Sequence, residues 1–225
     1  MLRAFLFDFD GTIVDTEPLH YAAFAEVLSK RGITLGESEY FEHYLSLTDR
    51  ECLERVIERT DRLDLRVEID RLFEEKVAAM AKRLAGEVRL FPGAREFITE
   101  ASALGPLAIV SGALRDEVRR ILERSGLTRA FSAVVAADDV HRGKPDPEGY
   151  RLGWQTLRQQ GLSDLEPHEC LAIEDSPKGI FAARAAGMRI LGLAHSRPAE
   201  ALDRADRVVP SYGHIRWDDL QSIFR

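Results

Sequence analysis

Short apolar runs alternate with longer amphipathic stretches along most of this chain. The first run, Phe5-Leu6-Phe7, has the continuous apolar character of a strand that is buried on both faces. Comparable runs follow at 106–110, 133–136, 171–173 and 189–193, and the segments between them have helical periodicity. Strands that alternate with helices form a parallel sheet with helices on both of its faces. The pattern therefore predicts an α/β fold.

Residues 16–85 have a different pattern, in which helical periodicity continues without a convincing strand. The first helix is predicted to begin after Thr16 and to continue to Arg31, because Gly32 then ends it. This block interrupts the sheet after its first strand, so it is an insertion beside the carboxyl end of that strand. We expect a helical cap domain at 16–87 and a catalytic core formed by 1–15 and 88–225. A lid over a site and a merely packed subdomain both remain open.

Charge and composition exclude several classes of partner. The formal net charge is −7, which gives no basic footprint for nucleic acid. We find no apolar stretch long enough to span a bilayer, and Met1-Leu2-Arg3 leads directly into the first strand without a signal peptide. The two cysteines, Cys52 and Cys170, favour a reducing compartment over a disulfide framework. We expect a cytoplasmic protein that binds no nucleic acid and no membrane and is a monomer or weak dimer.

Polar side chains follow four of the predicted strands. Asp8 and Asp10 follow the first strand, and because Asp-Gly is also common in turns, a plain turn remains an alternative for Asp10-Gly11. In open α/β sheets, ligands bind outside the carboxyl ends of the strands, so these groups should converge. The other members of the predicted cluster are Ser111, Lys144, Glu174 and Asp175.

Four acidic groups in one crevice would repel one another without a cation. Oxygen ligands favour Mg²⁺ over zinc, which prefers histidine or cysteine. With Mg²⁺ and Lys144 offsetting the charge, the site would attract a dianion such as phosphate. Asp8 would then attack phosphorus, and Asp10 would act as general acid and base. Adjacent strand residues point to opposite faces, so Glu174 and Asp175 reach one metal only if the strand has already turned.

The same residues resemble the four motifs of the haloacid dehalogenase superfamily, in the family's order and over nearly the whole chain. The motifs are Asp8-Phe9-Asp10-Gly11-Thr12, Ser111-Gly112, Gly143-Lys144-Pro145 and Ile173-Glu174-Asp175-Ser176. The helical insertion is similar to the cap of the β-phosphoglucomutase and phosphoglycolate phosphatase branch. The resemblance implies a Rossmann-like core and a cap that moves about hinges near Val14-Asp15 and Gly86-Leu90. The resemblance also implies Mg²⁺. From the chemistry above we expect the Mg²⁺ ligands Asp8, Asp10 (through its carbonyl), Glu174 and Asp175, and the phosphate-binding residues Thr12, Ser111, Gly112 and Lys144.

Asp10 separates the reactions within this family. Family dehalogenases and phosphonatases lack an acid at this position, so the chain looks like a phosphate-ester enzyme. We expect a phosphomonoesterase that acts on a small phosphorylated metabolite, a sugar phosphate above all. A β-phosphoglucomutase-type enzyme and a non-catalytic binding protein on the same scaffold remain as alternatives.

The predicted cap contributes further candidates. His20 resembles a mutase-branch histidine that links cap closure to the acid/base aspartate. The sequence is equally consistent with a polar helix residue that faces solvent. The mutase cap carries a phosphate-binding arginine in the stretch that here reads Ser46-Leu47-Thr48-Asp49-Arg50-Glu51. Asp49 stands at that position, which counts against mutase activity. Arg50 and Lys76 are possible substrate contacts or ordinary charged surface residues.

Overall fold

The computed structural model describes residues 1–44, 47–84, 86 and 88–224, which form two compact units. The core unit combines Met1–Asp15 with Val88–Arg225, and the helical unit is Thr16–Glu87. Ser46, in the stretch compared with the mutase cap, lies outside the described residues, as do Ala85 and Glu87 near the second predicted hinge.

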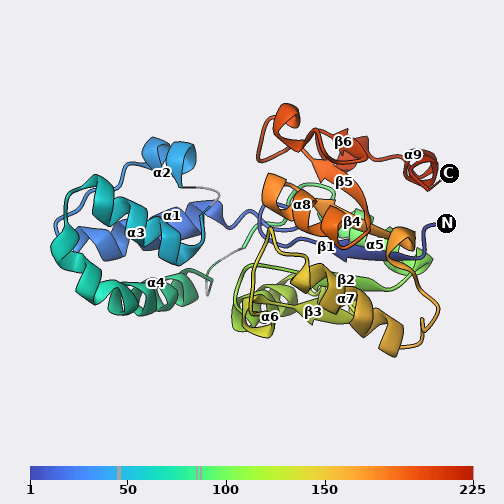
Figure 1. Ribbon diagram of the computed structural model, residues 1–225, viewed down its shortest axis with the longest axis horizontal. Helices are drawn as coiled ribbons and strands as arrows, with labels where there is room; N and C mark the ends of the chain where they lie inside the picture. The colour runs from blue at the N-terminus through green and yellow to red at the C-terminus, as the bar shows by residue number, and fades with distance from the viewer. Residues whose placement is uncertain (45–46, 85, 87, 225) are drawn as a thin grey trace. The chain divides into compact units, whose positions relative to one another are not determined.

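The core unit is built on one six-stranded parallel sheet, which confirms the predicted fold class (Figure 1). The order of the strands across the sheet is β3-β2-β1-β4-β5-β6. Sequence patterning missed β6, because its apolar run is only Val208-Val209, flanked by Arg207 and Pro210. The strands are β1 (Ala4–Phe7), β2 (Leu107–Val110), β3 (Ala133–Val135), β4 (Cys170–Glu174), β5 (Arg189–Leu193) and β6 (Arg207–Val209).

Strand β1 is completely buried and sends alternate side chains into two apolar layers. Leu6 belongs to the cluster that includes Tyr150 of α7 and Ile180 of α8. Phe5 faces the other way and meets Trp217 of α9, with ring centroids 6.1 Å apart. Helices therefore cover both faces of the sheet, as the pattern predicts. The helices of this unit are α5 (Ala94–Leu104), α6 (Arg115–Ser125), α7 (Glu148–Gln159), α8 (Pro177–Ala185) and α9 (Trp217–Ser222).

The helical unit consists of four α-helices and a short 3₁₀ segment in its described residues. They are α1 (Glu17–Ser29), α2 (Glu37–His43), α3 (Asp49–Arg59), the 3₁₀ segment Leu63–Glu68, and α4 (Ile69–Leu84). Helix α1 ends two residues before the predicted Arg31, and Gly32 follows with a φ of 74°. Helix α3 begins with a capping box, in which Thr48 and Glu51 satisfy each other's backbone N–H groups.

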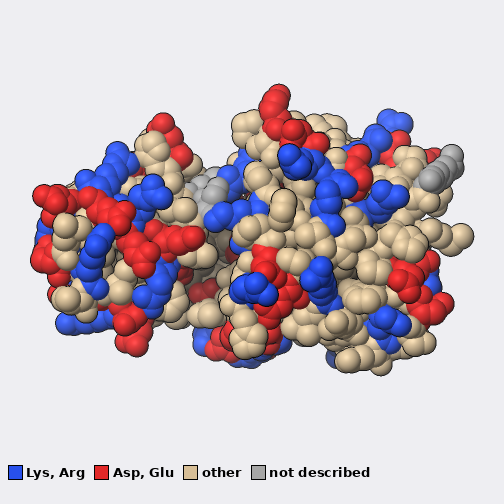
Figure 2. Space-filling view, in the orientation of Figure 1, with Lys and Arg blue, Asp and Glu red and all other residues tan. Residues whose placement is uncertain are grey.

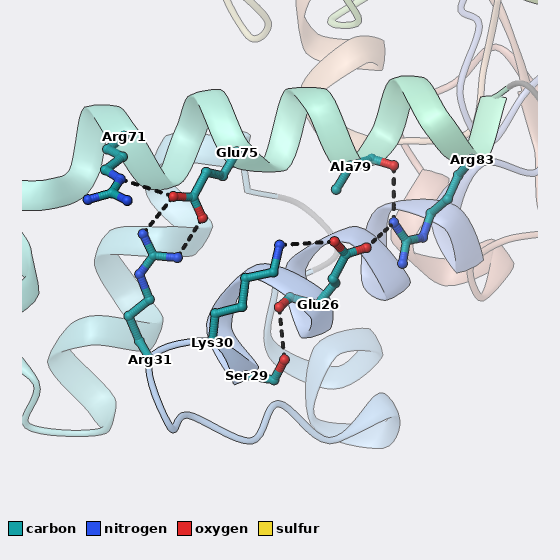
Figure 3. A network of polar contacts seen from close by, with 8 residues as sticks. All are labelled: Glu26, Ser29, Lys30, Arg31, Arg71, Glu75, Ala79 and Arg83. Carbon is teal, nitrogen blue, oxygen red and sulfur yellow. Dashed lines mark hydrogen bonds and ion pairs between the residues drawn. The ribbon is translucent and has the colours of Figure 1, made fainter.

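Ion pairs join the two ends of the helical unit's chain, α1 and α4 (Figure 3). Arg31, just after α1, makes two hydrogen bonds to Glu75 of α4, at 2.5 and 2.8 Å. Glu26 of α1 accepts from Arg83 of α4 at 2.9 Å. A bidentate guanidinium–carboxylate pair fixes orientation as well as distance. These contacts hold the first and last helices of the unit against each other around the buried residues Phe24, Leu28, Leu72 and Met80.

The surface carries both signs of charge. On the face shown in Figure 2, basic and acidic side chains are interspersed. None of the helices in the described part of the chain combines the length and the apolar character needed to cross a membrane. Cys52 and Cys170 are both buried free thiols.

Candidate active site

The first two candidate residues follow the central strand of the sheet. Strand β1 pairs with β2 on one side and with β4 on the other, so the strand order reverses here. The backbone N–H of Asp8 still donates to Ile173 of β4 at 2.9 Å, which continues the ladder past the end of β1. Ligands of doubly wound sheets bind at this kind of reversal, outside the carboxyl ends of the strands. Asp8 and Asp10 therefore lie at the expected binding edge.

Lys144 joins two carboxylates that are far apart in the sequence. Its Nζ lies 2.6 Å from Oδ1 of Asp8 and 2.6 Å from Oε1 of Glu174. Tyr150, one turn into α7, donates to the same Glu174 oxygen at 2.6 Å. Burial opposes the charge on Lys144, but the two acids outweigh it and raise the pKa of the ammonium. Lys144 is thus a permanent cation beside Asp8.

The phosphate-binding candidates at β1 and β2 have different surroundings. Ser111 donates to Oδ2 of Asp10 at 3.3 Å and accepts the N–H of Ala113 at 2.9 Å. Gly112 is exposed, and no described atom lies within 4 Å of where its Cβ would be. Thr12 is fully buried, and its Oγ1 has no hydrogen-bond partner among the described residues. The structure thus brings Ser111 to Asp10 and leaves open space at Gly112, whereas the Thr12 hydroxyl is enclosed by protein.

Asp8, Glu174 and Asp175 form a group that could hold a metal ion. One carboxylate oxygen from each lies within 4.8 Å of the others, and all three residues are buried. Strand β4 ends at Glu174, so Asp175 is no longer bound by strand alternation. The strand has therefore ended before Asp175, which is the condition under which these two adjacent acids can reach one metal ion. The carboxylate of Asp10 is not a member of the group.

The ionisation of this group shows that its charge is not balanced by protein alone. Burial raises the pKa of Asp8 to about 7 and that of Asp175 to about 6, and the charge of Lys144 opposes both shifts. Four carboxylates, including Asp10, face two cations, Lys144 and Arg197, so two negative charges remain when all are ionised. An all-oxygen donor set with this surplus fits a hard divalent cation.

Close approach of Gly11 to Asp175 also shapes the site. Gly11 has a φ of 79°, and a Cβ added there would overlap the carboxylate of Asp175. Only glycine combines this backbone conformation with the absence of a side chain. The glycine that suggested a plain turn is therefore required by the acidic cluster.

The candidates in the helical unit form a cluster of their own. Lys76 is completely buried, and its Nζ lies 2.5 Å from Oδ2 of Asp49 and 2.8 Å from Nδ1 of His20. Since an ammonium can only donate, Nδ1 of His20 is the acceptor in this contact. The surface interpretation of Lys76 is thus wrong. Arg50 points elsewhere, pairing with Asp70 at 2.5 Å while remaining 48% exposed.

Sequence reasoning missed four side chains that contact the core site. Tyr150 binds Glu174, and Ser196 donates to Asp175 at 2.5 Å. His195 contacts the Gly11 carbonyl, and Tyr212 donates to the Thr12 carbonyl at 3.0 Å. His195 and Ser196 follow β5, so the rule that points to strand ends could have found them. Tyr150 lies on the buried face of α7, where a hydroxyl needs a partner.

The chain resembles known proteins over nearly its whole length. It is 30% identical to validoxylamine A 7'-phosphate phosphatase of Streptomyces hygroscopicus subsp. limoneus, over 98% of this chain and 99% of that protein. It is 31% identical to the phosphorylated carbohydrates phosphatase of Thermotoga maritima, over 87% of each. The crystal structure of β-phosphoglucomutase from Clostridium difficile superposes with a TM-score of 0.83 at 25% identity, covering 100% of this chain and 97% of that one.

A family profile settles the membership. The profile described as haloacid dehalogenase-like hydrolase matches residues 5–193, which include Asp8, Ser111, Lys144 and Asp175. The chain therefore belongs to the haloacid dehalogenase-like hydrolase family.

Proposed function

We propose that this protein is a Mg²⁺-dependent phosphomonoesterase that hydrolyses a small phosphorylated metabolite, a sugar phosphate in the first instance. The observation that carries the proposal is the mostly buried Lys144, which contacts Asp8 beside Asp175, while Asp10 is hydrogen-bonded to Ser111. A nucleophile, a cation next to it and an acid two residues further on are the groups that phosphate-ester hydrolysis needs.

The reaction would proceed in two displacements. A carboxylate oxygen of Asp8 attacks phosphorus, the bond from phosphorus to the ester oxygen breaks, and Asp10 donates a proton to the departing alkoxide. Water then attacks the aspartyl-phosphate, Asp10 takes the water's proton, and inorganic phosphate leaves with Asp8 restored. Lys144 and Ser111 would bind the phosphoryl oxygens throughout, because this transfer depends on alignment and charge neutralisation.

Mg²⁺ fits the donor set described above. Asp8, Asp175 and the main-chain carbonyl of Asp10 would hold it. Glu174 has the weakest claim as a direct ligand, since Lys144, Tyr150 and Ser176 already bond to its two oxygens. When bound, the ion would neutralise charge on the phosphoryl group. Glu174 would then act mainly by holding Lys144 in place.

The relatives support a phosphorylated small molecule as the substrate. One is named for validoxylamine A 7'-phosphate and the other for phosphorylated carbohydrates. Both names describe phosphatases, which favours hydrolysis as the reaction of this chain. We place the enzyme in the cytoplasm, supported by its two free, buried thiols, and expect a monomer or weak dimer.

The mutase alternative draws its support from the structural neighbour named β-phosphoglucomutase. A mutase must also bind the phosphate that does not react, and for that it needs an available cation in the cap. In the helical unit, Asp49 is paired with the buried Lys76, so an acid neutralises this cation. This pairing favours the phosphatase over the mutase. The non-catalytic alternative leaves the combination of Asp8, Asp10 and Lys144 without a purpose.

The helical unit would act as the cap of this enzyme. It would close over the core during catalysis, bending near Val14-Asp15 and Gly86-Leu90, and exclude water other than the hydrolytic molecule. Of the cap candidates His20, Lys76 and Arg50, we propose His20 as the substrate contact, because Lys76 is completely buried and paired with Asp49, and Arg50 is paired with Asp70. Two observations support the assignment of this unit as the cap. The unit is entirely helical in its described residues, and the chain enters it from the core after Asp15 and returns to the core at Val88.

Phosphate release tests the proposal directly. The purified protein is assayed with Mg²⁺ on sugar phosphates, phosphoglycolate and nucleotides, and β-glucose 1-phosphate is also followed for conversion to the 6-phosphate. We expect release from one or a few esters, lost in Asp8→Asn and retained in Asp116→Asn, which changes a carboxylate that is 68% exposed on α6. Isomerisation without release would establish the mutase instead. Activity that persists in Asp8→Asn would disprove the assigned nucleophile.

A further inference from the structure

The loop that follows β5 reaches the turn that carries Asp10. The N–H of Ala194 donates to Val209 at 2.9 Å and anchors the start of the loop on β6. The next residue, His195, places its Nε2 2.6 Å from the carbonyl oxygen of Gly11. Residues 184 positions apart in the chain are thus joined at the Gly11–Thr12 peptide, one residue beyond Asp10.

Packing fixes the imidazole in this position. The ring of His195 stacks on that of Phe91, with centroids 3.8 Å apart and planes 11° from parallel. A carbonyl oxygen can only accept, so Nε2 carries the proton and donates. Burial lowers the pKa of His195, which favours the neutral ring with a single proton. The stacked ring therefore presents one defined N–H to Gly11.

The turn that receives this hydrogen bond is held at several points. Gly11 donates its own N–H to the carbonyl of Val14 at 2.9 Å, and Tyr212 donates to the carbonyl of Thr12 at 3.0 Å. His195 binds the Gly11–Thr12 peptide, which lies between the Asp10–Gly11 peptide, whose N–H donates to Val14, and the Thr12–Ile13 peptide, whose carbonyl accepts from Tyr212. Rotation of the Gly11 peptide would turn the Asp10 backbone and displace its carboxylate from Ser111.

We propose that His195 is a positioning residue, which holds the Gly11 peptide so that Asp10 is oriented to protonate the leaving group. This inference rests on the proposed function, in which Asp10 is the general acid. General acid catalysis contributes roughly 10²–10⁴-fold to the rate and depends on geometry. Loss of the His195 contact should therefore remove part of this factor without removing substrate binding.

Leaving-group dependence separates this role from a structural one. An alkyl phosphate needs protonation of its leaving oxygen, whereas the p-nitrophenolate of p-nitrophenyl phosphate leaves with little help. In His195→Ala we expect kcat to fall about 10- to 100-fold on the best alkyl ester and less than about 3-fold on p-nitrophenyl phosphate, with KM nearly constant on both. His195→Gln, whose amide N–H can reach a similar point, should recover much of the alkyl-ester rate.

A neighbouring variant serves as the matched control. Ser196 lies in the same loop but donates to Asp175 instead of Gly11. Ser196→Ala should therefore change the rates on both esters by a similar factor. It removes a hydrogen bond to Asp175 of the acidic cluster and leaves the general acid Asp10 in place. Equal losses on the two esters in His195→Ala, or no loss, would overturn the positioning role. A wild-type protein that releases phosphate from no ester would overturn the proposed function itself, and the positioning role with it.

Discussion

Nζ of Lys144 lies 2.6 Å from Oδ1 of Asp8, and these two residues are 136 positions apart in the chain. The pairing is enclosed, since both side chains are mostly buried. Burial alone would favour a protonated, unreactive Asp8, whose pKa is raised to about 7, and the charge of Lys144 opposes that shift. The lysine thus helps to keep the proposed nucleophile ionised.

Removal of this cation should reduce both activity and stability. In Lys144→Met we expect kcat/KM to fall at least ~100-fold, because the site loses a charge that stabilises the nucleophile and the phosphoryl group. Asp8 and Glu174 lose a buried partner, which should cost about 3–5 kcal/mol of unfolding free energy. Enzyme assays and urea titrations measure the two effects. Near-normal turnover in a folded variant would contradict this account of Lys144.

Substitution of Asp10 should lower mainly kcat. Asp10→Asn keeps the size of the side chain but cannot donate or accept the catalytic proton, so kcat on an alkyl ester should fall roughly 10²–10⁴-fold. The loss should be smaller on p-nitrophenyl phosphate. Comparison of the two esters under single-turnover conditions checks this expectation. An unchanged kcat on the alkyl ester would remove Asp10 from the acid role.

Much of the core site follows from a rule that applies to sequence. Asp8, Asp10, Ser111 and Asp175 each come directly after a strand or within a few residues of it, and parallel strands bring their carboxyl ends to one edge. The apolar runs that mark those strands are strong enough to locate the edge without coordinates. The predicted cluster was therefore accessible from the order of apolar and polar positions.

Other features depend on tertiary packing that no local pattern contains. A lysine in an amphipathic helix is typical of an exposed face, yet Lys76 is completely buried, because Asp49 and His20 of other helices compensate it. Tyr150 and His195 resemble ordinary core and loop residues until their partners are known. The three residues of β6 pair with β5 only because the sheet already exists.

Gly11 offers a test of the acidic cluster through its backbone. Gly11→Ala would place a Cβ against the carboxylate of Asp175 at a φ of 79°. Gly32→Ala is the matched control, since Gly32 has a similar φ of 74° and no described atom within 4 Å of its Cβ position. Each should lose about 1 kcal/mol of stability from backbone strain, and Gly11→Ala should lose more because its Cβ also displaces the Asp175 carboxylate. Only Gly11→Ala should also lose most of its activity, measured as phosphate release by equal amounts of folded protein.

Metal removal should abolish activity reversibly. Treatment with a chelator is expected to stop phosphate release, and added Mg²⁺ should restore it, because the four carboxylates of the site, Asp10 included, outnumber its two cations. Asp175→Asn should raise the Mg²⁺ concentration needed for half-maximal activity by about tenfold or more. Titration calorimetry checks the binding independently of turnover. Full activity in the chelated protein would exclude the proposed metal dependence.

Asp49 should make the helical unit sensitive to acid. Burial opposes its ionisation, but His20 and Lys76 outweigh burial and lower the pKa of Asp49 to about 2, below its ordinary value of 3.8. A carboxylate whose pKa is lower in the folded state stabilises the fold at any pH above its unfolded-state pKa. This contribution is lost as the pH falls from about 4 to about 2. A shift of this size corresponds to ~2 kcal/mol at neutral pH. Asp49→Asn should therefore be less stable at pH 7 and should lose less stability on acidification.

Hydrogen exchange on the amides of α1, α3 and α4, followed at pH 7 and pH 3, resolves this effect within the helical unit. Asp70→Asn is the control, because Asp70 pairs with Arg50 at the surface and is 82% exposed. Surface pairs of this kind contribute about 0–1 kcal/mol, so this variant should follow the wild type at both pH values. If Asp49→Asn and Asp70→Asn had the same pH dependence, the buried trio of His20, Asp49 and Lys76 would not be what stabilises the unit. A larger acid response in the wild type than in Asp49→Asn, with Asp70→Asn unchanged, would assign that response to Asp49.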